Sequence, residues 1–429
     1  MDRSMGAVLG GTFTLRFSTG LTGAMLGVYL AKLPEHGGPE VAATTLALLH
    51  ATFYLTELVF SPLFGILSDR LGHHRVMLFG PVFGAVAVIM TGLTTNLFIL
   101  GGTRLLEGAS TAASVPSILG YIALATAGNE LLRGKAAARF EGATLAGLGV
   151  GFATAPLLFD AFGPGAFFLN AVVYGISFLI YQFGVEDRDR EERLAAAADR
   201  SGRMDLGRYV VLLRTSHVWL LAPTWIAVNA SIGVWFSQSI FQFSKADPRF
   251  PDQFLLRGFS PVEISLAAVV IGILFGAGLL YWGDRFKAFR RTTIILYGIL
   301  GGALLTAAGV AINHQDGLAI VVPLVALLAA GFGLFVLAGA TPAALGLLAD
   351  ISERFPTDRG AIMGLYSVFL AVGQIAGSLI GGLAADWRGI DGLLAATFGL
   401  LLVALLPLAQ LRRHEHYVGG PASPAVIDE

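Results

Sequence analysis

The sequence predicts an all-α membrane protein of twelve transmembrane helices arranged as two pseudo-symmetric six-helix bundles. Three observations predict this fold class: the composition, a series of long apolar runs, and an internal repeat. Of the 429 residues, 55% are hydrophobic and only 13% are charged, whereas a typical soluble domain is about 25% charged. So few charges cannot cover a water-exposed surface. The net charge of −1 and the lack of Cys argue against a nucleic-acid-binding protein and against thiol or Cys-metal chemistry.

The apolar runs are long enough to cross a bilayer, because a hydrocarbon core of about 30 Å requires about 20 helical residues. In chain order, they cover residues 8–31, 43–67, 76–95, 97–125, 141–162, 164–184, 216–241, 261–282, 292–313, 318–348, 360–384 and 391–411. The first run contains Arg16 and lacks a cleavage-site pattern, so we expect a first span rather than a signal peptide.

The basic residues predict the orientation. With both termini in the cytoplasm, most of the 28 Lys and Arg residues fall on the inner side, as the positive-inside rule requires. The outer loops then hold only Lys32, Lys245, Arg249, Arg257 and Arg388. We therefore expect a multi-pass protein of the plasma or inner membrane, with the lipid bilayer as a partner and with no partner in nucleic acid.

A charged, Ala-rich segment at residues 185–215 divides the spans six and six. The expected domains are an N-terminal bundle at 1–184, a cytoplasmic linker at 185–215, a C-terminal bundle at 216–411 and a cytoplasmic tail at 412–429.

The two halves also resemble each other at one constant spacing. Pro116 and Gly120 correspond to Pro342 and Gly346, and Gly151 corresponds to Gly377. Because six spans separate the copies, both halves point the same way through the membrane. Parallel halves of this kind are a transporter architecture with the solute site between them.

The loop after the second span reads GILSDRLGHHR, from Gly65 to Arg75. Gly65 permits close helix approach, and Asp69 can face the positive N-terminus of another helix. Arg70 and Arg75 can brace carboxylates on the inner surface. A basic inner loop that only satisfies the orientation rule is the simpler alternative.

This loop resembles the signature G-x-L-a-D-R-x-G-R-[RK] of the major facilitator superfamily. Six positions match, and His73 and His74 depart from the basic pattern; the matches are Gly65, Leu67, Asp69, Arg70, Gly72 and Arg75. The second half carries a weaker copy, YWGDRFKAFRR, with Asp284, Arg285, Arg290 and Arg291. The resemblance implies alternating access, and we expect the first loop, with Asp284 and Arg285, to form a cytoplasmic gate that closes against the eleventh helix near Arg359.

Two further elements are similar to superfamily motifs. RLLEGASTA, from Arg104 to Ala112, resembles R-x-x-Q-G-x-x-x-A with Glu107 in place of Gln. GVGFATAPLLF, from Gly149 to Phe159, resembles the antiporter element G-x-x-x-G-P-x-x-G-G but lacks its terminal Gly pair. We expect the small or rigid residues of this span to serve helix packing; they are Gly147, Gly151 and Pro156.

Ionisable residues inside spans are costly and point to function. Arg104 and Glu107 share one helix face with Thr111 and lie about 10–15 Å deep. Arg16 and Glu57 fall at equal depth on neighbouring helices, which predicts a buried ion pair. We expect this group of four to carry the central charge and proton coupling; static ion pairs are the alternative.

The seventh and eleventh spans supply aromatic and amide side chains that suit a pocket for apolar ligands. The expected cavity residues are Thr111, Trp225, Asn229, Phe236, Gln238, Tyr366 and Gln374. Packing of the aromatic residues against lipid or other helices is the alternative.

These features predict a secondary active transporter, most simply one that couples proton entry to the efflux of amphiphilic small molecules. Uptake of a small metabolite by symport or uniport, and a sensor that moves no solute, are the alternatives. The sequence shows no phosphate-binding loop, no nucleophile–base pair and no metal-ligand set, so we expect no enzyme activity, no cofactor and no metal. The expected partners are a small solute and protons, and the expected state is a monomer.

Overall fold

A computed structural model describes residues 3–126, 130–186, 217–353 and 359–414. Within these ranges the regular structure is helical, apart from one isolated bridge between Ala246 and Arg257. The all-α prediction is therefore confirmed.

The chain divides into two compact units. The N-terminal unit comprises Met1–Gly202 with Phe259–Val269, and the C-terminal unit comprises Arg203–Gly258 with Val270–Glu429. The division falls in the segment expected to be a linker, whose residues 187–216 lie outside the described part.

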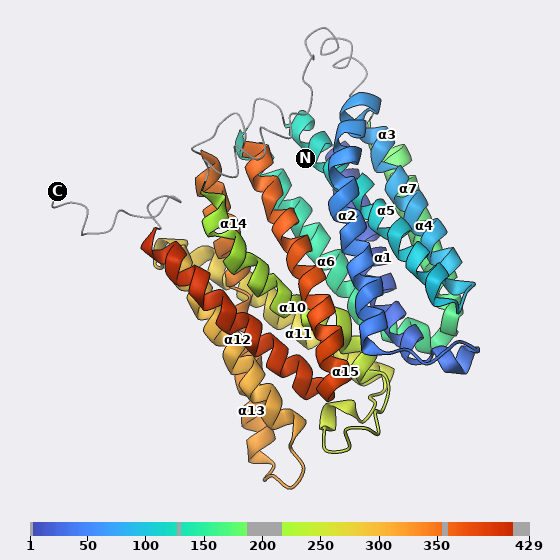
Figure 1. The fold of residues 1–429 in the computed structure, drawn as a ribbon. Coiled ribbons are helices and arrows are strands. Elements are labelled where there is room, and N and C mark those ends of the chain that lie inside the picture. Colours follow the sequence, from blue (N-terminus) through green and yellow to red (C-terminus); the bar gives the residue numbers. More distant parts are fainter. Residues whose placement is uncertain (1–2, 127–129, 187–216, 354–358, 415–429) are drawn as a thin grey trace, which may run out of the picture. The chain divides into compact units, whose positions relative to one another are not determined.

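The first seven helices belong to the N-terminal unit (Figure 1). They are α1 (Arg3–Ala31), α2 (Ala43–Leu71), α3 (His73–Met77), α4 (Phe79–Gly92), α5 (Leu97–Ala125), α6 (Glu130–Phe162) and α7 (Ala166–Gly184). Short 3-10 turns at Leu33–His36 and Gly163–Gly165 lie between helices.

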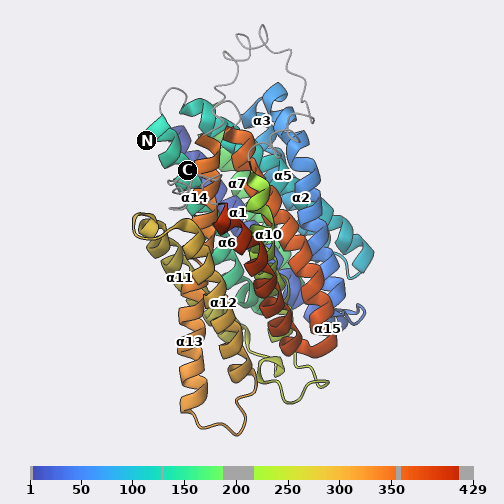
Figure 2. The ribbon, with the colours of Figure 1, turned by 60° about the vertical axis from the view of Figure 1, so that its left-hand side comes forward.

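The later helices form the C-terminal unit, except that the first turns of α11 group with the N-terminal one. They are α10 (Ala222–Phe243), α11 (Pro261–Gly283), α12 (Arg291–Asn313), α13 (Val321–Leu337), α14 (Ala340–Glu353) and α15 (Arg359–Arg413). In both ribbon views α12 and α13 lie side by side (Figures 1 and 2). Further 3-10 turns cover Val218–Leu220, Phe254–Leu256 and Asp284–Lys287.

These helices account for the twelve expected spans. Eight stretches are long and apolar enough to cross a membrane, and two of them, Ala138–Gly184 and Ser367–Arg413, are 47 residues long. Each of these two holds a pair of spans, since α6 and α7 are separate and α15 bends at Arg388 and Gly389. The remaining two spans are α1 and α10. Both contain several polar side chains that are buried against other parts of the protein rather than exposed to lipid.

Two expected spans each comprise two consecutive helices. The third span consists of α3 and α4, with the joint at Leu78, and the tenth consists of α13 and α14. The backbone keeps right-handed helical angles at both joints, at Leu78 (φ −69°, ψ −24°) and at Ala338 (φ −55°, ψ −27°), and the apolar pattern runs through them.

Glycines let helix backbones touch in the N-terminal unit. A Cβ at Gly147 would meet the Arg16 Cβ at 2.9 Å, and one at Gly151 would meet the Leu21 backbone nitrogen at 2.8 Å, so α6 packs directly on α1. A Cβ at Gly108 would meet the Thr56 Cβ at 2.8 Å, which brings α5 equally close to α2. Close backbone approach through small residues is the usual basis of helix packing in membranes.

The C-terminal unit uses the same device between α10 and α15. A Cβ at Gly373 would meet the Asn229 Cβ at 2.5 Å, and Gly377 faces the backbone of Ala230. Around this contact lies an apolar core that includes Trp225, Ile294 and Ala344.

The internal repeat has a structural counterpart. In the N-terminal unit the imidazole of His73 lies against Gly120, and in the C-terminal unit the guanidinium of Arg291 lies against Gly346. In each unit, a basic side chain next to the charged loop thus packs on the matched glycine of the repeat.

Candidate functional site

A buried ion pair lies near the middle of the N-terminal unit. Arg104 Nη1 contacts Glu107 Oε2 one turn along α5, and the two residues are 3% and 2% exposed. Helix α5 begins where the side chain of Asn96 accepts hydrogen bonds from the backbone N–H groups of Phe98 (2.9 Å) and Ile99 (3.3 Å). This cap sets the helix register and places the pair about 12–17 Å along the helix axis.

Helix α2 covers the arginine. The guanidinium carbon of Arg104 lies 4.9 Å from the centre of the Phe53 ring, in cation–π geometry. His50, buried on the same helix, lies within electrostatic range of Arg104. Because Gly108 has no side chain, the backbone of α2 packs directly on α5 and covers this side of the Arg104–Glu107 pair.

The other side of Glu107 faces α1 and α7. Glu107 Oε1 has no hydrogen-bond partner, although Thr22 and Tyr174 approach the carboxylate. The Thr22 hydroxyl donates to the Ser18 carbonyl (2.9 Å) and accepts from Asn170 Nδ2 (2.7 Å). The Thr22 hydroxyl proton is therefore not available to Glu107. Glu107 Oε1 stays buried without a hydrogen bond, and a buried polar atom left unpaired in this way costs about 1–3 kcal/mol.

The expected ion pair between Arg16 and Glu57 is not formed. Both side chains are half-buried, and the charge of Arg16 acts on Glu57 and also on Glu141 of α6. Equal depth on neighbouring helices was the basis of the prediction, but depth does not determine which way a side chain turns around the helix axis. Arg16 therefore interacts electrostatically with both carboxylates, and no direct ion pair with either is formed among the described residues.

The residues of the GILSDRLGHHR loop lie where α2 ends and α3 begins. Gly72 adopts a positive φ of 101°, a conformation that glycine accommodates readily. Asp69 is exposed and its carboxylate lies 3.9 Å from His73 Nε2, while His73 Nδ1 lies 3.1 Å from the Ser68 hydroxyl. Arg70 and Arg75 are exposed.

Gly65 lies on α2, before these residues. A Cβ added at Gly65 would lie 3.8 Å from the Pro116 Cβ, an ordinary van der Waals distance. Arg359, the expected closing partner of the loop, has no described side chain.

The matching loop of the C-terminal unit contains Asp284 and Arg285, both exposed, with Arg285 stacked on the Tyr281 ring at 4.6 Å. Next to this loop, Arg291 pairs with Asp350 and donates to the Gly346 carbonyl at 2.7 Å. The sequence places this arginine at the end of the second loop copy but does not predict its pairing with Asp350.

The expected cavity residues fall into separate places. Asn229 on α10 lies against Gly373, next to Gln374 on α15, and its amide donates to the Trp225 carbonyl at 2.9 Å. Trp225 and Gln238 are fully buried, whereas Phe236 is 36% exposed.

Thr111 is buried on α5 of the N-terminal unit, one turn beyond Glu107, and Pro156 is buried in α6. The side chain of Tyr366 lies outside the described part.

Sequence reasoning missed a row of polar residues on α7. Asn170, Tyr174, Ser177 and Tyr181 are all 0% exposed. Their spacing of four, three and four residues places them on one helix face, so a search for polar periodicity within spans would have found them.

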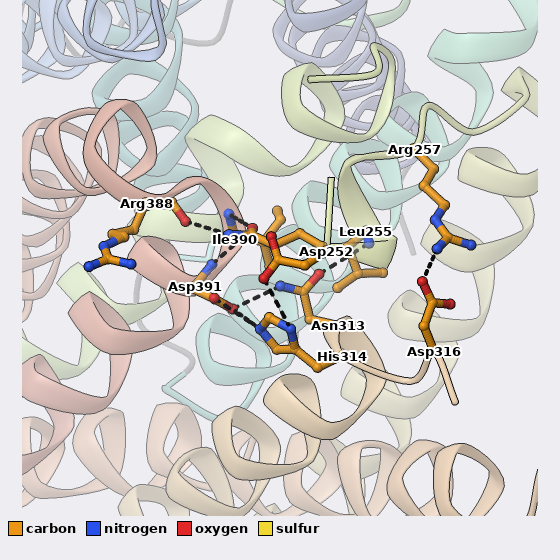
Figure 3. A network of polar contacts seen from close by, with 10 residues as sticks. Asp252, Leu255, Arg257, Asn313, His314, Asp316, Arg388, Ile390 and Asp391 are labelled. Atoms are coloured by element: carbon orange, nitrogen blue, oxygen red, sulfur yellow. Dashed lines mark hydrogen bonds and ion pairs between the residues drawn. The ribbon is translucent and has the colours of Figure 1, made fainter. Parts of the chain in front are cut away.

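A second polar network joins three loops at one end of the C-terminal unit (Figure 3). His314 lies 2.9 Å from Asp391 and 3.6 Å from Asp252, and Asn313 donates to Asp391 at 2.9 Å. Arg257 and Asp316 form a separate exposed pair. The network ties the connections after α10 and α12 to the bend in α15.

Comparison with known proteins identifies the family. The model described as "Major Facilitator Superfamily" matches residues 8–254 and 248–425. "Multidrug resistance protein 2" of Bacillus subtilis is 24% identical over 81% of this chain and 81% of its own length. "Quinolone resistance protein NorA" of Staphylococcus aureus is 23% identical over 87% of this chain and 88% of its own.

The fold is similar to that of a solved nucleoside transporter, NupG. That structure covers 96% of this chain and 99% of its own with a TM-score of 0.70, at 14% sequence identity. An identity this low supports the shared fold only.

Proposed function

Because this chain belongs to the major facilitator superfamily, we propose that it exports amphiphilic small molecules in exchange for protons, by alternating access. The relatives named for multidrug and quinolone resistance, each aligned over most of its length, support export as the direction and amphiphilic compounds as the solute class. The proposed setting is the plasma or inner membrane, with both termini in the cytoplasm and the protein as a monomer.

The observation that carries the proton-coupling proposal is the buried Arg104–Glu107 pair. A proton on Glu107 cancels the carboxylate charge and removes the partner of Arg104. An unpaired buried charge costs several kcal/mol, so the protein then favours a conformation in which Arg104 finds water or another partner. Proton binding shifts the conformational equilibrium only as far as the two states differ in proton affinity.

Arg16 offers a second charged position. Its charge acts on both Glu57 and Glu141, so protonation of either carboxylate leaves the other to balance the arginine. In our proposal Arg16, Glu57 and Glu141 set the net charge near the cytoplasmic half of the bundle. Glu107 carries the coupled proton.

The test uses acidic-inside proteoliposomes that hold DNA, in which ethidium fluorescence reports proton-driven dye accumulation. We expect Glu107→Gln to lower this transport by about 100-fold, as loss of a proton-transfer group typically does, and Glu57→Gln to lower it less. Asp316→Asn, which removes one partner of an exposed pair, is the matched control and keeps the wild-type rate.

Three outcomes contradict the proposal. Full proton-driven transport in both glutamine variants rejects the coupling assignment. Accumulation of one metabolite with no dye flux, across a panel of solutes, favours uptake by symport or uniport. Dye binding without any flux favours a membrane sensor.

A further inference from the structure

The polar row on α7 faces a matching row on α1. Asn170 Nδ2 donates to the Ser18 carbonyl (3.1 Å) and to the Thr22 hydroxyl (2.7 Å). Further along, the Ser177 hydroxyl donates to the Gly11 carbonyl (2.9 Å). Near the end of α7, the Tyr181 hydroxyl lies 3.4 Å from the Thr12 hydroxyl. From Asn170 to Tyr181, the row extends about 16 Å along the helix.

Among the described residues of the two rows and the Glu107 carboxylate, four buried atoms have no hydrogen-bond partner. They are Ser18 Oγ, Asn170 Oδ1, Tyr174 Oη and Glu107 Oε1. Two belong to hydroxyl groups that can donate, and two are oxygens that can only accept. A metal ion would satisfy the acceptors alone, whereas water both donates and accepts. Buried water typically binds where polar groups would otherwise stay unsatisfied.

The row joins Glu107 to the end of the unit where α2 and α3 meet. At the Glu107 end, Tyr174 and Thr22 approach the carboxylate. At the other end, His74 Nε2 lies 3.0 Å from the Tyr181 carbonyl. Glycines leave room for both tyrosine rings, since Gly84 lies against the ring of Tyr174 and Gly11 against that of Tyr181.

We propose that α1 and α7 enclose a row of hydroxyl groups and bound water that carries protons between Glu107 and the His74 end of the bundle. In each step an oxygen of the row accepts one proton and releases another to the next oxygen, so that one proton is transferred and no other bond changes. The proposal rests on the proposed function, because it supplies the route by which Glu107 exchanges its proton.

The route avoids the charged side of the pair. The charged and titratable groups that face Glu107 are Arg104 on its own helix and Tyr174 on α7, while His50 and Tyr54 on α2 interact with Arg104. Arg104 contacts Glu107 Oε2, which leaves Oε1 as the oxygen without a partner that can take a proton arriving along α1 and α7.

The test measures how fast Glu107 is protonated after a pH jump, by time-resolved infrared spectroscopy of the full-length protein in detergent. The carboxylic C=O signal is assigned by its loss in Glu107→Gln. We expect Tyr174→Phe, which keeps the ring and removes the hydroxyl, to slow the signal at least about tenfold without changing its final amplitude. The control is Tyr29→Phe, since this buried tyrosine donates to the Thr94 carbonyl outside the row.

A second variant guards against misfolding of the first. Ser177→Ala removes another hydroxyl of the row with little change in volume, and we expect it to slow the same signal. Wild-type rates in both variants, with the amplitude still lost in Glu107→Gln, overturn the route but leave the proposed coupling in place. An unchanged signal in Glu107→Gln means that Glu107 does not titrate, and it overturns both proposals. Equal slowing in Tyr29→Phe assigns the effect to packing and also overturns the route.

Discussion

At the scale of single residues, the candidate site depends on one glycine as much as on its charges. Gly108 lets α2 approach α5 until Phe53 covers Arg104. An added methyl group would have to displace the Thr56 side chain or the Phe53 backbone, and overpacking of this kind costs about 1–3 kcal/mol.

We therefore expect Gly108→Ala to lower the thermal unfolding midpoint of the purified protein and to weaken proton-driven dye transport. Gly102→Ala is the matched control, because a Cβ there meets nothing within 4 Å and alanine is the better helix former. The idea of a sterically required glycine is wrong if the two variants unfold at the same temperature.

At the scale of elements, the bend that divides α15 into two spans depends on a loop side chain. Gly389 adopts a φ of 58° and a ψ of −133°. Gln253 holds the bend, since its amide donates to the Arg388 carbonyl (2.9 Å) and accepts from the Ile390 N–H (2.8 Å).

A side chain at Gly389 would be strained by the positive φ, and its Cβ would meet the Leu256 side chain at 2.6 Å. We expect Gly389→Ala to destabilise the protein by about 1–3 kcal/mol, measured as the loss of unfolding free energy in a denaturant titration. Gly399→Ala, in the straight part of α15 with nothing within 4 Å, keeps the wild-type stability. Equal stability of both variants contradicts a conformational requirement at the bend.

The same loop contains an acid-sensitive pair. Hydrogen bonds from Arg249 hold the pKa of Asp247 below its usual value of 3.8. A lowered folded-state pKa stabilises the fold above the unfolded-state pKa, and this stabilisation is lost as the pH falls through the folded-state value. Because Arg249 is 58% exposed, solvent screening limits the effect to about 0.5 kcal/mol.

We expect Asp247→Asn to unfold at a slightly lower temperature than wild type at neutral pH. The difference between the two proteins disappears below the lowered pKa of Asp247, where the wild-type carboxyl is also protonated. A difference that stays constant across this range contradicts the assignment.

At the scale of the whole molecule, the two charged loops occupy matching places in the repeat but differ in chemistry. The N-terminal loop has Asp69 beside His73, and the C-terminal unit has Arg291 paired with Asp350. In the proposed cycle, Asp69 holds the cytoplasmic gate closed in one conformation, so its loss changes the conformational equilibrium and leaves the solute site intact.

We expect Asp69→Asn to lower the maximal rate of dye transport several-fold and to leave the half-saturating dye concentration nearly unchanged. Transport kinetics in proteoliposomes measure both quantities, with Asp316→Asn as the exposed-carboxylate control. An unchanged maximal rate removes the gate from the proposal, and a change confined to the half-saturating concentration moves Asp69 to solute binding.

The sequence alone determined the membrane environment, the twelve spans and the family, because apolar run length, basic-residue placement and a loop motif are local properties of the chain. It also placed Arg104 and Glu107 together, since residues three apart on a helix share a face. Only the tertiary structure decided that Arg16 acts on both Glu57 and Glu141 without a direct ion pair, that α15 bends at Gly389, and that α7 turns a row of polar side chains toward α1. Rotation of each helix about its axis sets these contacts, and packing between helices fixes that rotation.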